Sequence, residues 1–260
     1  MGHAENTGTA VRPADITESE WAARVQLASC YQLFDFIGWS EAIFNHISLR
    51  VPGPDHHFLV NPFGLNYNEV TALNLVKVDL QGQNVTPGPY QGNVAGFALH
   101  GVIHEHRQHT ACVIHTHTTN GMAVACKEGG LRHDDFYGAL LYGRVAYHEF
   151  EGITIYDDER PRMLESLGSH DCLILRNHGL VAMGSSLPQA VQNYWTLQRA
   201  CDIQVAADAM HGASHPIASS VKTKTAADAA RFDSSGQLAH VFYDAFIRRM
   251  ERARGLRVRA

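Results

Sequence analysis

The sequence predicts an α/β fold in which helices pack around a mixed β-sheet. The chain has 260 residues, of which 45% are hydrophobic, enough apolar material for a sizeable core. Its apolar periodicity changes repeatedly between helix-like and strand-like segments. Two apolar runs, residues 111–117 and 172–184, read as strands and are flanked by helical patterns. We expect one domain over residues 1–260, with 1–15 an N-terminal extension and 212–260 a C-terminal segment.

The first third of the chain predicts a long helix, two strands, a short helix and a third strand. Residues 16–37 carry a Thr-x-x-Glu capping signature at Thr17 and Glu20 and an apolar stripe, and Gly38 ends the helix. Residues 45–51 and 56–62 are short apolar stretches between turn formers, which is typical of a β-meander. Residues 68–82 predict a short helix and a further strand.

The remainder alternates helices with strands in the same way. Strands are predicted at 111–117, 145–152 and on both sides of Asn177-His178-Gly179, and helices at 95–108, 119–129, 158–168 and 186–210. The helix at 186–210 is long and amphipathic. Helical and strand segments in this order favour layers of helix around a sheet.

Composition excludes several classes of protein. The net charge is −5, and the basic tail 248–260 has no aromatic or helix-turn-helix context, so we expect no nucleic-acid partner. No apolar run reaches the roughly 20 residues of a membrane span, and the start of the chain does not resemble a secretory signal. The five cysteines lack Cys-x-x-Cys spacing, which favours reduced thiols and a cytoplasmic protein.

A His-x-His pair at the end of an apolar run indicates a metal site. Side chains at i and i+2 of a strand point to one face, so His115 and His117 can converge on one ion where their strand leaves the core at a sheet edge. His178, between two strand-like runs, is the natural third imidazole. Three histidines with an open coordination position describe a catalytic site rather than a structural one. By spacing alone, a polar pair without a metal is an equally good interpretation.

The stretches "GWSEAIFNHISLR", "PFGLNYNEVT", "VIHTHTTNGMAVA" and "LRNHGLVAMG" resemble the class II aldolase/adducin family in their order along the chain. The resemblance implies a three-layer α/β/α domain with a mostly antiparallel central sheet. It also implies a homotetramer with active sites between subunits. His115, His117 and His178 match the family's metal-binding imidazoles. We expect one divalent ion per chain, with zinc favoured and manganese, cobalt and iron also compatible.

Several positions depart from the sugar-phosphate aldolases of that family. The acidic residue that serves there as general acid/base corresponds to Gly96. Polar residues that help to hold phosphate correspond to Val94, Ala95 and Phe63, whereas Asn45 and Gly64 match. These three replacements remove polar groups that could hold a phosphate and add apolar surface to the pocket. They therefore predict a flatter, less charged substrate than a sugar phosphate.

These features predict a metal-dependent carbon–carbon lyase, either a decarboxylase or an aldolase-type enzyme, acting on a small non-phosphorylated keto or aromatic carboxylic acid. A metal can stabilise the electron pair that departing carbon dioxide leaves, so decarboxylation does not need the missing acid. Two alternatives stay open: a non-haem iron oxygenase on the same fold, and a non-catalytic, adducin-like assembly module.

The candidate site residues beyond the metal ligands fall into two groups. Tyr137 and His100 are candidate catalytic groups, either of which could return a proton. The candidate substrate-binding residues are Asn45, Asn61, Phe63 and Gly64. His100 and His104 share a helix face and are also interpreted as a buried, hydrogen-bonded pair beneath the site. His56, His57 and His148 are expected at exposed strand positions.

Overall fold

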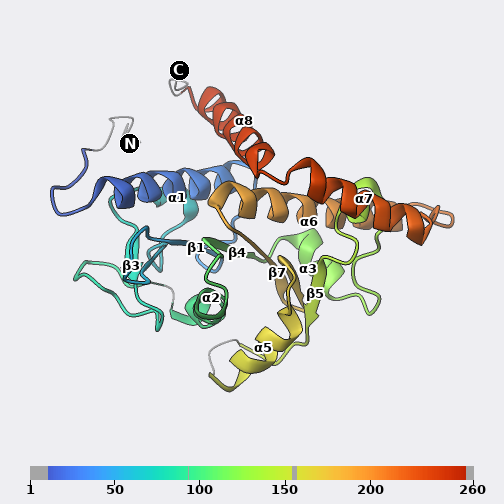
Figure 1. Cartoon of the computed structure of the whole chain (residues 1–260), viewed down its shortest axis with the longest axis horizontal. Coiled ribbons are helices and arrows are strands. Elements are labelled where there is room, and N and C mark those ends of the chain that lie inside the picture. The colour runs from blue at the N-terminus through green and yellow to red at the C-terminus, as the bar shows by residue number, and fades with distance from the viewer. Residues whose placement is uncertain (1–10, 93, 154–156, 256–260) are drawn as a thin grey trace.

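The computed structural model describes residues 11–92, 94–153 and 157–255, with the side chains at positions 94, 95, 97 and 157 left out (Figure 1). Most of the predicted extension 1–15 therefore lies outside the described residues. The N-terminal helix and the two C-terminal helices lie along the same side of the molecule in Figure 1.

The centre of the fold is a seven-stranded sheet in the order β3-β2-β1-β4-β7-β6-β5. Every neighbouring pair is antiparallel except β5 and β6, which are parallel. The mostly antiparallel sheet is thus confirmed. The strands are β1 (His46–Arg50), β2 (Phe58–Val60), β3 (Val76–Val78), β4 (Cys112–Thr116), β5 (Val145–His148), β6 (Cys172–Leu175) and β7 (Gly179–Gly184).

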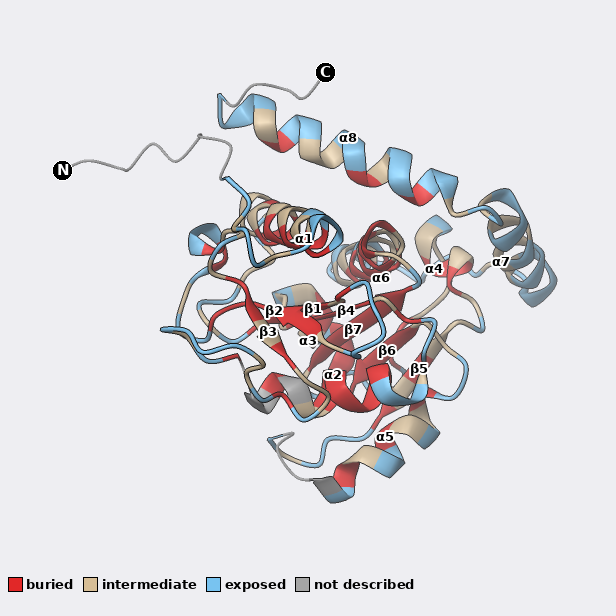
Figure 2. Cartoon of the chain, turned by 60° about the vertical axis from the view of Figure 1, so that its left-hand side comes forward, coloured by how far each residue is buried: buried red, intermediate tan, exposed pale blue. Residues whose placement is uncertain are grey.

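Helices cover both faces of this sheet, which confirms the three-layer architecture. Helices α1 and α6 lie on one face, α2 and α5 lie on the other, and α8 packs outside α1 and α6 (Figure 2). The helices are α1 (Glu18–Phe36), α2 (Val94–His106), α3 (Thr119–Ala125), α4 (Phe136–Leu140), α5 (Arg160–Leu167), α6 (Leu187–Asp208), α7 (Ser219–Phe232) and α8 (Gln237–Ala253). Two short 3-10 helices occur at Tyr67–Glu69 and Asp157–Glu159.

The first helix begins where its capping signature predicts. The Thr17 hydroxyl accepts a hydrogen bond from the Glu20 amide at 3.2 Å, satisfying one of the free donors of the first turn. The Glu20 side chain does not complete a capping box. Instead it is buried and forms ion pairs of 2.9 Å with Arg24 and with Lys77 of β3. These contacts tie α1 to the outer strand of the sheet.

The central strand β4 separates two apolar cores. Cys112 and Ile114 belong to the core under α1 and α6, whereas Val113 belongs to the core under α2 and α5. Strand alternation therefore places His115 on the α2 side. Because β4 is the fourth of seven strands, the His-x-His pair lies at the end of the central strand and not at a sheet edge as expected from the sequence.

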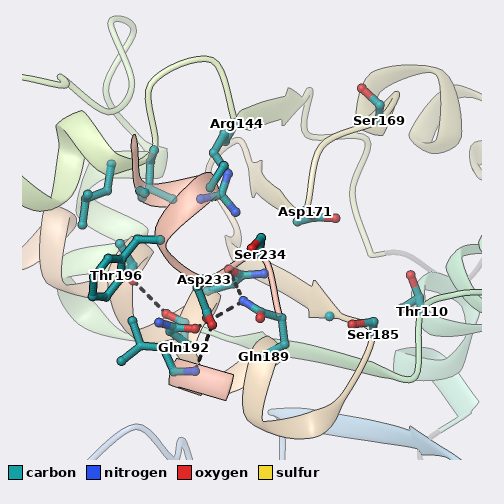
Figure 3. Close-up of a pocket in the computed structure, with 18 of the residues that line it drawn as sticks. Thr110, Arg144, Ser169, Asp171, Ser185, Gln189, Gln192, Thr196, Asp233 and Ser234 are labelled. Atoms are coloured by element: carbon teal, nitrogen blue, oxygen red, sulfur yellow. Dashed lines mark hydrogen bonds between the residues drawn. The ribbon is translucent and has the colours of Figure 1, made fainter. Parts of the chain in front are cut away.

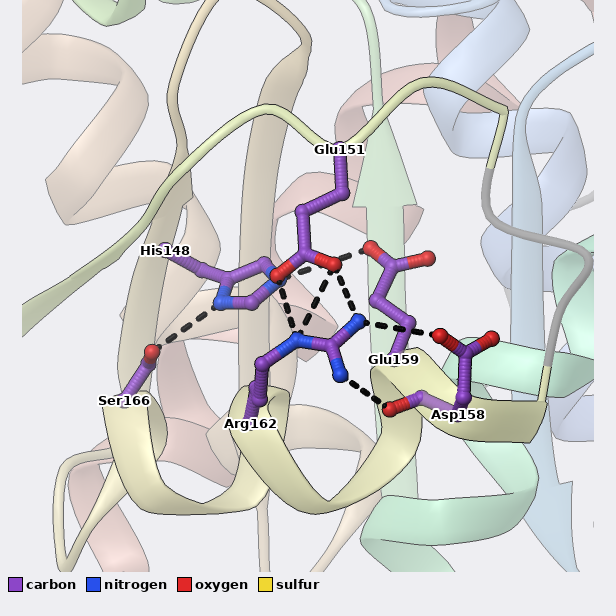
Figure 4. Close-up of polar contacts among 6 residues, drawn as sticks. All are labelled: His148, Glu151, Asp158, Glu159, Arg162 and Ser166. Carbon is purple, nitrogen blue, oxygen red and sulfur yellow. Dashed lines mark hydrogen bonds and ion pairs between the residues drawn. The ribbon is translucent and has the colours of Figure 1, made fainter.

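His148 is buried, contrary to the expectation of an exposed strand position. It is 4% exposed, because α5 packs on β5 and covers it. Its Nδ1 atom lies 3.0 Å from the Ser166 hydroxyl, and its Nε2 atom lies 3.4 Å from a Glu159 carboxylate oxygen (Figure 4). Arg162 of α5 holds Glu151 beside this group. The sequence pattern missed this because a short strand can be covered on both faces.

Two further expectations concern thiols and membranes. All five cysteines are free, four of them are buried, and Cys126 is exposed. Over the residues that the structure describes, no helix combines the length and apolarity that crossing a membrane requires.

Candidate metal centre

The three predicted histidines meet at one point of the structure. Their nitrogen atoms, one from each ring, lie within 4.8 Å of one another. The Nε2 atoms of His115 and His117 are 2.8 Å apart, and the His178 ring lies 4.9 Å from each of the other two ring centroids. Strand β4 supplies His115 and the segment after it supplies His117, while the turn between β6 and β7 supplies His178.

Hydrogen bonds at Nδ1 determine which nitrogen each of the first two rings presents. His115 Nδ1 lies 3.0 Å from the Leu180 carbonyl oxygen, and His117 Nδ1 lies 3.0 Å from a Glu41 carboxylate oxygen. Carbonyl and ionised carboxylate oxygens only accept, so both Nδ1 atoms carry the proton of the neutral ring. Both Nε2 atoms are then unprotonated and face each other. Two converging lone pairs with anchored rings are the donor arrangement of a metal site.

The tight turn that brings His178 to this point requires its neighbours. Asn177 adopts a left-handed conformation with φ of 58°, which asparagine tolerates better than most residues. A Cβ atom on Gly179 would lie 2.6 Å from the Thr116 carbonyl oxygen. It would also lie 3.0 Å from the His117 ring and 3.2 Å from the His115 ring, which are tight contacts. The close approach of this turn to β4 therefore requires a glycine at position 179, and asparagine suits the backbone at position 177.

Burial keeps the three rings neutral. It lowers the pKa of His115 well below the ordinary value, and repulsion from the neighbouring imidazoles lowers it further. The pKa of His178 falls to about 4 for the same two reasons. Burial also lowers the pKa of His117, although Glu41 opposes the shift. Neutral imidazoles can ligate an ion without first losing a proton.

Asn45 supports this centre from the end of the loop before β1. Its side-chain oxygen accepts a hydrogen bond from the His117 amide at 3.1 Å, and its side-chain nitrogen donates to the Trp39 carbonyl at 3.1 Å. Both ends of the amide are engaged within the chain. Asn45 thus holds the backbone of a metal-site histidine, and a direct substrate contact stays a prediction.

The other predicted substrate-binding residues follow β2. Asn61 is fully buried, its oxygen accepts from the Tyr31 hydroxyl at 3.1 Å, and its Nδ2 has no hydrogen-bond partner among the described residues. Phe63 is half exposed, and Gly64 turns the chain with φ of 93°. The side chains of Val94 and Ala95 lie outside the described part of the chain. The substrate roles of these residues stay predictions.

The two predicted catalytic residues lie in different surroundings. Tyr137 belongs to α4 and packs edge-on against Trp195 of α6, with ring centroids 5.1 Å apart. Within the described residues, no hydrogen bond or ring contact joins Tyr137 to the three imidazoles. His100 is buried on α2 and lies 2.8 Å from His46, whose ring packs 4.9 Å from that of His115. His100 thus adjoins the site through another residue.

Two residues near the centre escaped sequence reasoning. Glu41 orients His117, and His46 flanks His115 at the paired position of the neighbouring strand β1. A Cβ atom on Gly96 would lie 2.3 Å from the His46 ring, so that ring occupies the space of a side chain at position 96. The sequence signal that could have identified His46 was a histidine at the start of a predicted strand. Glu41 gave no signal, because an acidic residue in a loop is common.

A cleft of about 1440 Å³ lies elsewhere in the molecule, between α4, α6 and α7 (Figure 3). Gln189, Gln192 and Thr196 of α6 and Ser234 between α7 and α8 are among the residues that line it. The three imidazoles do not line this cleft. Its size therefore says nothing about the metal centre.

The fold and the centre define a known class of protein. The sequence profile of the class II aldolase and adducin N-terminal domain matches residues 25–205, and the chain belongs to this family. A Pseudomonas aeruginosa protein with the provisional name of an aldolase class 2 protein is 43% identical over 194 residues, which are 75% of this chain and 74% of that one. Rat alpha-adducin is 44% identical over 191 residues, 72% of this chain but 26% of the adducin.

Solved structures agree with this assignment. The crystal structure of an aldolase II superfamily protein from Pseudomonas syringae superimposes with a TM-score of 0.88 and 40% identity, covering 92% of this chain and 96% of that one. An L-fuculose 1-phosphate aldolase from Glaciozyma antarctica superimposes with a TM-score of 0.79 and 25% identity, covering 96% and 97%. Relatives of this chain therefore include a named aldolase as well as adducins.

Proposed function

We propose that this protein is a metal-dependent carbon–carbon lyase that acts on a small, non-phosphorylated keto or aromatic carboxylic acid. The observation that carries the proposal is the convergence of two unprotonated Nε2 atoms, from His115 and His117, beside His178. A divalent ion held by these residues, zinc being the first choice, would supply Lewis-acid stabilisation of developing negative charge.

The chain's own residues would hold and shape this site. Glu41 and the Leu180 carbonyl fix the two rings, so that ligand geometry is set before substrate arrives. Phe150 is more than half exposed and its ring lies 6.4 Å from that of His178, which supports an apolar or aromatic substrate skeleton. Phe63 in place of a polar residue of the sugar-phosphate aldolases supports a substrate without phosphate.

The adducin relatives favour a second candidate, a non-catalytic assembly module in which the histidines hold no ion. Identity to rat alpha-adducin, 44%, differs little from the 43% identity to the bacterial relative, so similarity alone does not separate the two candidates. The hydrogen bonds that anchor His115 and His117 through Nδ1 leave both Nε2 lone pairs facing each other, which supports the enzyme, since an assembly module has no need of this arrangement.

Metal content and substrate turnover test the proposal together. Elemental analysis of the purified protein should find one divalent ion per chain, and His117→Ala should lose it while His57→Ala, at a partly exposed position away from the site, should keep it. Turnover of a panel of keto and aromatic acids should follow the ion and continue without oxygen. Equal metal in both variants, or no ion in the wild type, would favour the assembly module. Turnover that stops when oxygen is removed would favour the oxygenase.

The same panel tests the exclusion of phosphate. L-Fuculose 1-phosphate should be cleaved far more slowly than about 1 per second, an ordinary enzymatic rate. Cleavage at that rate would overturn the assignment of a non-phosphorylated substrate.

A further inference from the structure

His117 lies just beyond the part of β4 that the sheet holds. The pairing of β4 with β1 ends at His115, and its pairing with β7 ends at Thr116. The His117 amide donates to the Asn45 side chain rather than to a neighbouring strand. Thr118 still has extended backbone, with φ of −58° and ψ of 143°. The position of His117 therefore depends on what the residues on either side of it contact.

Both neighbours of His117 are bonded to helix α6. Side chains alternate along extended backbone, so Thr116 and Thr118 lie on the opposite side from the imidazoles. The Thr116 hydroxyl is hydrogen-bonded to the Tyr194 hydroxyl, which keeps its proton because burial raises the pKa of Tyr194. The Thr118 hydroxyl donates to the side-chain oxygen of Gln198. His117 is thus held between two threonines that are anchored on the same helix.

An acidic residue one turn further along α6 fixes the direction of the second bond. Asp202 Oδ1 lies 2.7 Å from Gln198 Nε2 and 2.9 Å from Asn120 Nδ2. A carboxylate only accepts, so both amides present their nitrogen to it. The Gln198 oxygen is then left to face Thr118. Asp202 therefore orients the Gln198 amide, and through Asn120 it also holds the start of α3.

A second buried glutamine of α6 gives a comparison. Gln204 is 6% exposed and Gln198 is 2% exposed. Gln204 accepts a hydrogen bond from the Arg132 amide at 2.7 Å and donates to the Gly130 carbonyl at 3.0 Å. The loop that it holds carries none of the three imidazoles. Loss of either amide should lower the stability of the fold, but only Gln198 is linked to one of the three histidines.

We propose that Gln198 is a positioning residue of the metal centre and acts on His117 through Thr118. In this arrangement Asp202 keeps the Gln198 amide in the required orientation. The inference rests on the metal binding of the proposed function and extends it to residues behind the strand. Glu41 holds the His117 ring, whereas the α6 residues hold its backbone. Metal ligands must lie within about 0.5 Å of their working positions, so a small shift of this backbone weakens binding.

The first test is competition between the zinc-loaded protein and a chelator. Gln198→Leu should weaken zinc affinity by about tenfold or more, the lower end of the range for residues that support metal ligands. Gln204→Leu is the matched control. It should lower the unfolding temperature of the metal-free protein about as much as Gln198→Leu does, yet keep the wild-type zinc affinity. Equal zinc affinities in the two variants would overturn the inference.

Variants of Thr118 test the route of the effect and do not require Gln198→Leu to fold. Thr118→Val removes the hydroxyl and nearly keeps the shape, so it should weaken zinc affinity about as much as Gln198→Leu. Thr118→Ser keeps the hydroxyl and should restore most of the affinity. The double variant Thr118→Val/Gln198→Leu should lose no more than either single variant, because both remove the same bond. Losses that multiply in the double variant, or equal affinities in Thr118→Val and Thr118→Ser, would overturn the route through Thr118.

Amide hydrogen exchange tests the same link without an ion. In metal-free protein the His117 amide should exchange several-fold faster, relative to core amides, in Gln198→Leu than in the wild type or in Gln204→Leu. Unchanged exchange in Gln198→Leu would overturn the positioning role while leaving the proposed function in place. A wild-type protein that binds no zinc would instead overturn the proposed function, and this inference with it.

Discussion

At the residue scale, the site depends on where side chains are absent as much as on where they are present. Gly179 lets the His178 turn approach β4, and Gly96 leaves room for the His46 ring. Neither requirement is visible in the spacing of the histidines. Each follows from the close approach of segments far apart in the sequence.

The first prediction concerns Gly96→Ala. Because the added methyl would lie 2.3 Å from the His46 ring, the ring must move, with an overpacking cost of about 1–3 kcal/mol. Because the His46 ring packs against that of His115, its displacement should disturb the site, and we expect lyase activity to fall at least tenfold with the ion retained. Gly129→Ala is the control, since a Cβ atom there meets nothing within 4 Å. Elemental analysis and kcat measure the two effects, and an equally active Gly96→Ala enzyme would contradict the geometry.

A second prediction concerns the carboxylate behind His117. Glu41→Gln replaces an ionised acceptor by a weaker neutral one, so we expect metal affinity to fall by about 10–100-fold, the usual effect of losing such a partner. Competition with a chelator measures the affinity. Glu128→Gln, at an exposed position after α3, should leave it unchanged. Equal affinities in the two variants would show that Glu41 does not orient the ligand.

At the element scale, the periodicity of apolar residues and the residues that cap or end helices predicted most of the fold. Thr17 and Gly38 marked the ends of α1, and the apolar runs around Asn177-His178-Gly179 became β6 and β7. The convergence of the three histidines followed from strand alternation and the family resemblance. The position of β4 in the middle of the sheet did not, because strand order is determined by long-range pairing.

The buried hydrogen bonds between β1 and α2 could not be predicted for a related reason. The sequence indicated that His100 and His104 share a helix face, but Ser48 joins them only because β1 packs against that face. Cross-element hydrogen bonds depend on the rotation of a helix against a sheet. His148 was misjudged similarly, since α5 rather than β5 determines its burial.

The buried histidines of this layer predict a pH dependence of stability. The pKa of His104 is about 3 in the folded protein and about 6.5 when unfolded, so the unfolded state binds more protons between these values. The stability that neutral His104 contributes is complete above about pH 6.5 and is lost as pH falls toward 3. By pH 5 this residue alone should cost about 2 kcal/mol in the free energy of unfolding.

Urea unfolding of metal-free protein at pH 8 and pH 5 measures this effect. His104→Leu should be less stable than the wild type at pH 8, yet should lose about 2 kcal/mol less between the two pH values. His57→Leu should lose as much as the wild type. A pH dependence that is the same in all three proteins would show that His104 is not held neutral by burial.

At the scale of the whole molecule, one chain leaves apolar surface uncovered near the cleft of Figure 3. Phe136 of α4, Phe232 of α7 and Leu238 of α8 line that cleft and are exposed, Phe232 by 80%. Exposed apolar side chains gathered in a cleft of this size are typical of an interaction surface. Tyr137 lies on the same short helix as Phe136, away from the imidazoles of its own chain.

Together with the homotetramer that the family resemblance implies, these placements lead to a last prediction: the protein is a homotetramer in which this cleft receives another copy of the chain. A buried phenylalanine stabilises an interface by about 1.5–3 kcal/mol, and a buried unpaired charge opposes it by at least as much. Phe232→Asp should therefore weaken assembly by at least about 3 kcal/mol, more than a hundredfold in dissociation constant.

Sedimentation velocity at micromolar concentration should show a tetramer for the wild type and smaller species for the variant. Val11→Asp, at a similarly exposed position that does not line the cleft, should leave the tetramer intact. If Tyr137 reaches a partner's metal centre, Phe232→Asp should also lower kcat without releasing the ion. A wild-type monomer would rule out the assembly, and an unchanged tetramer in Phe232→Asp would place the interface on another surface.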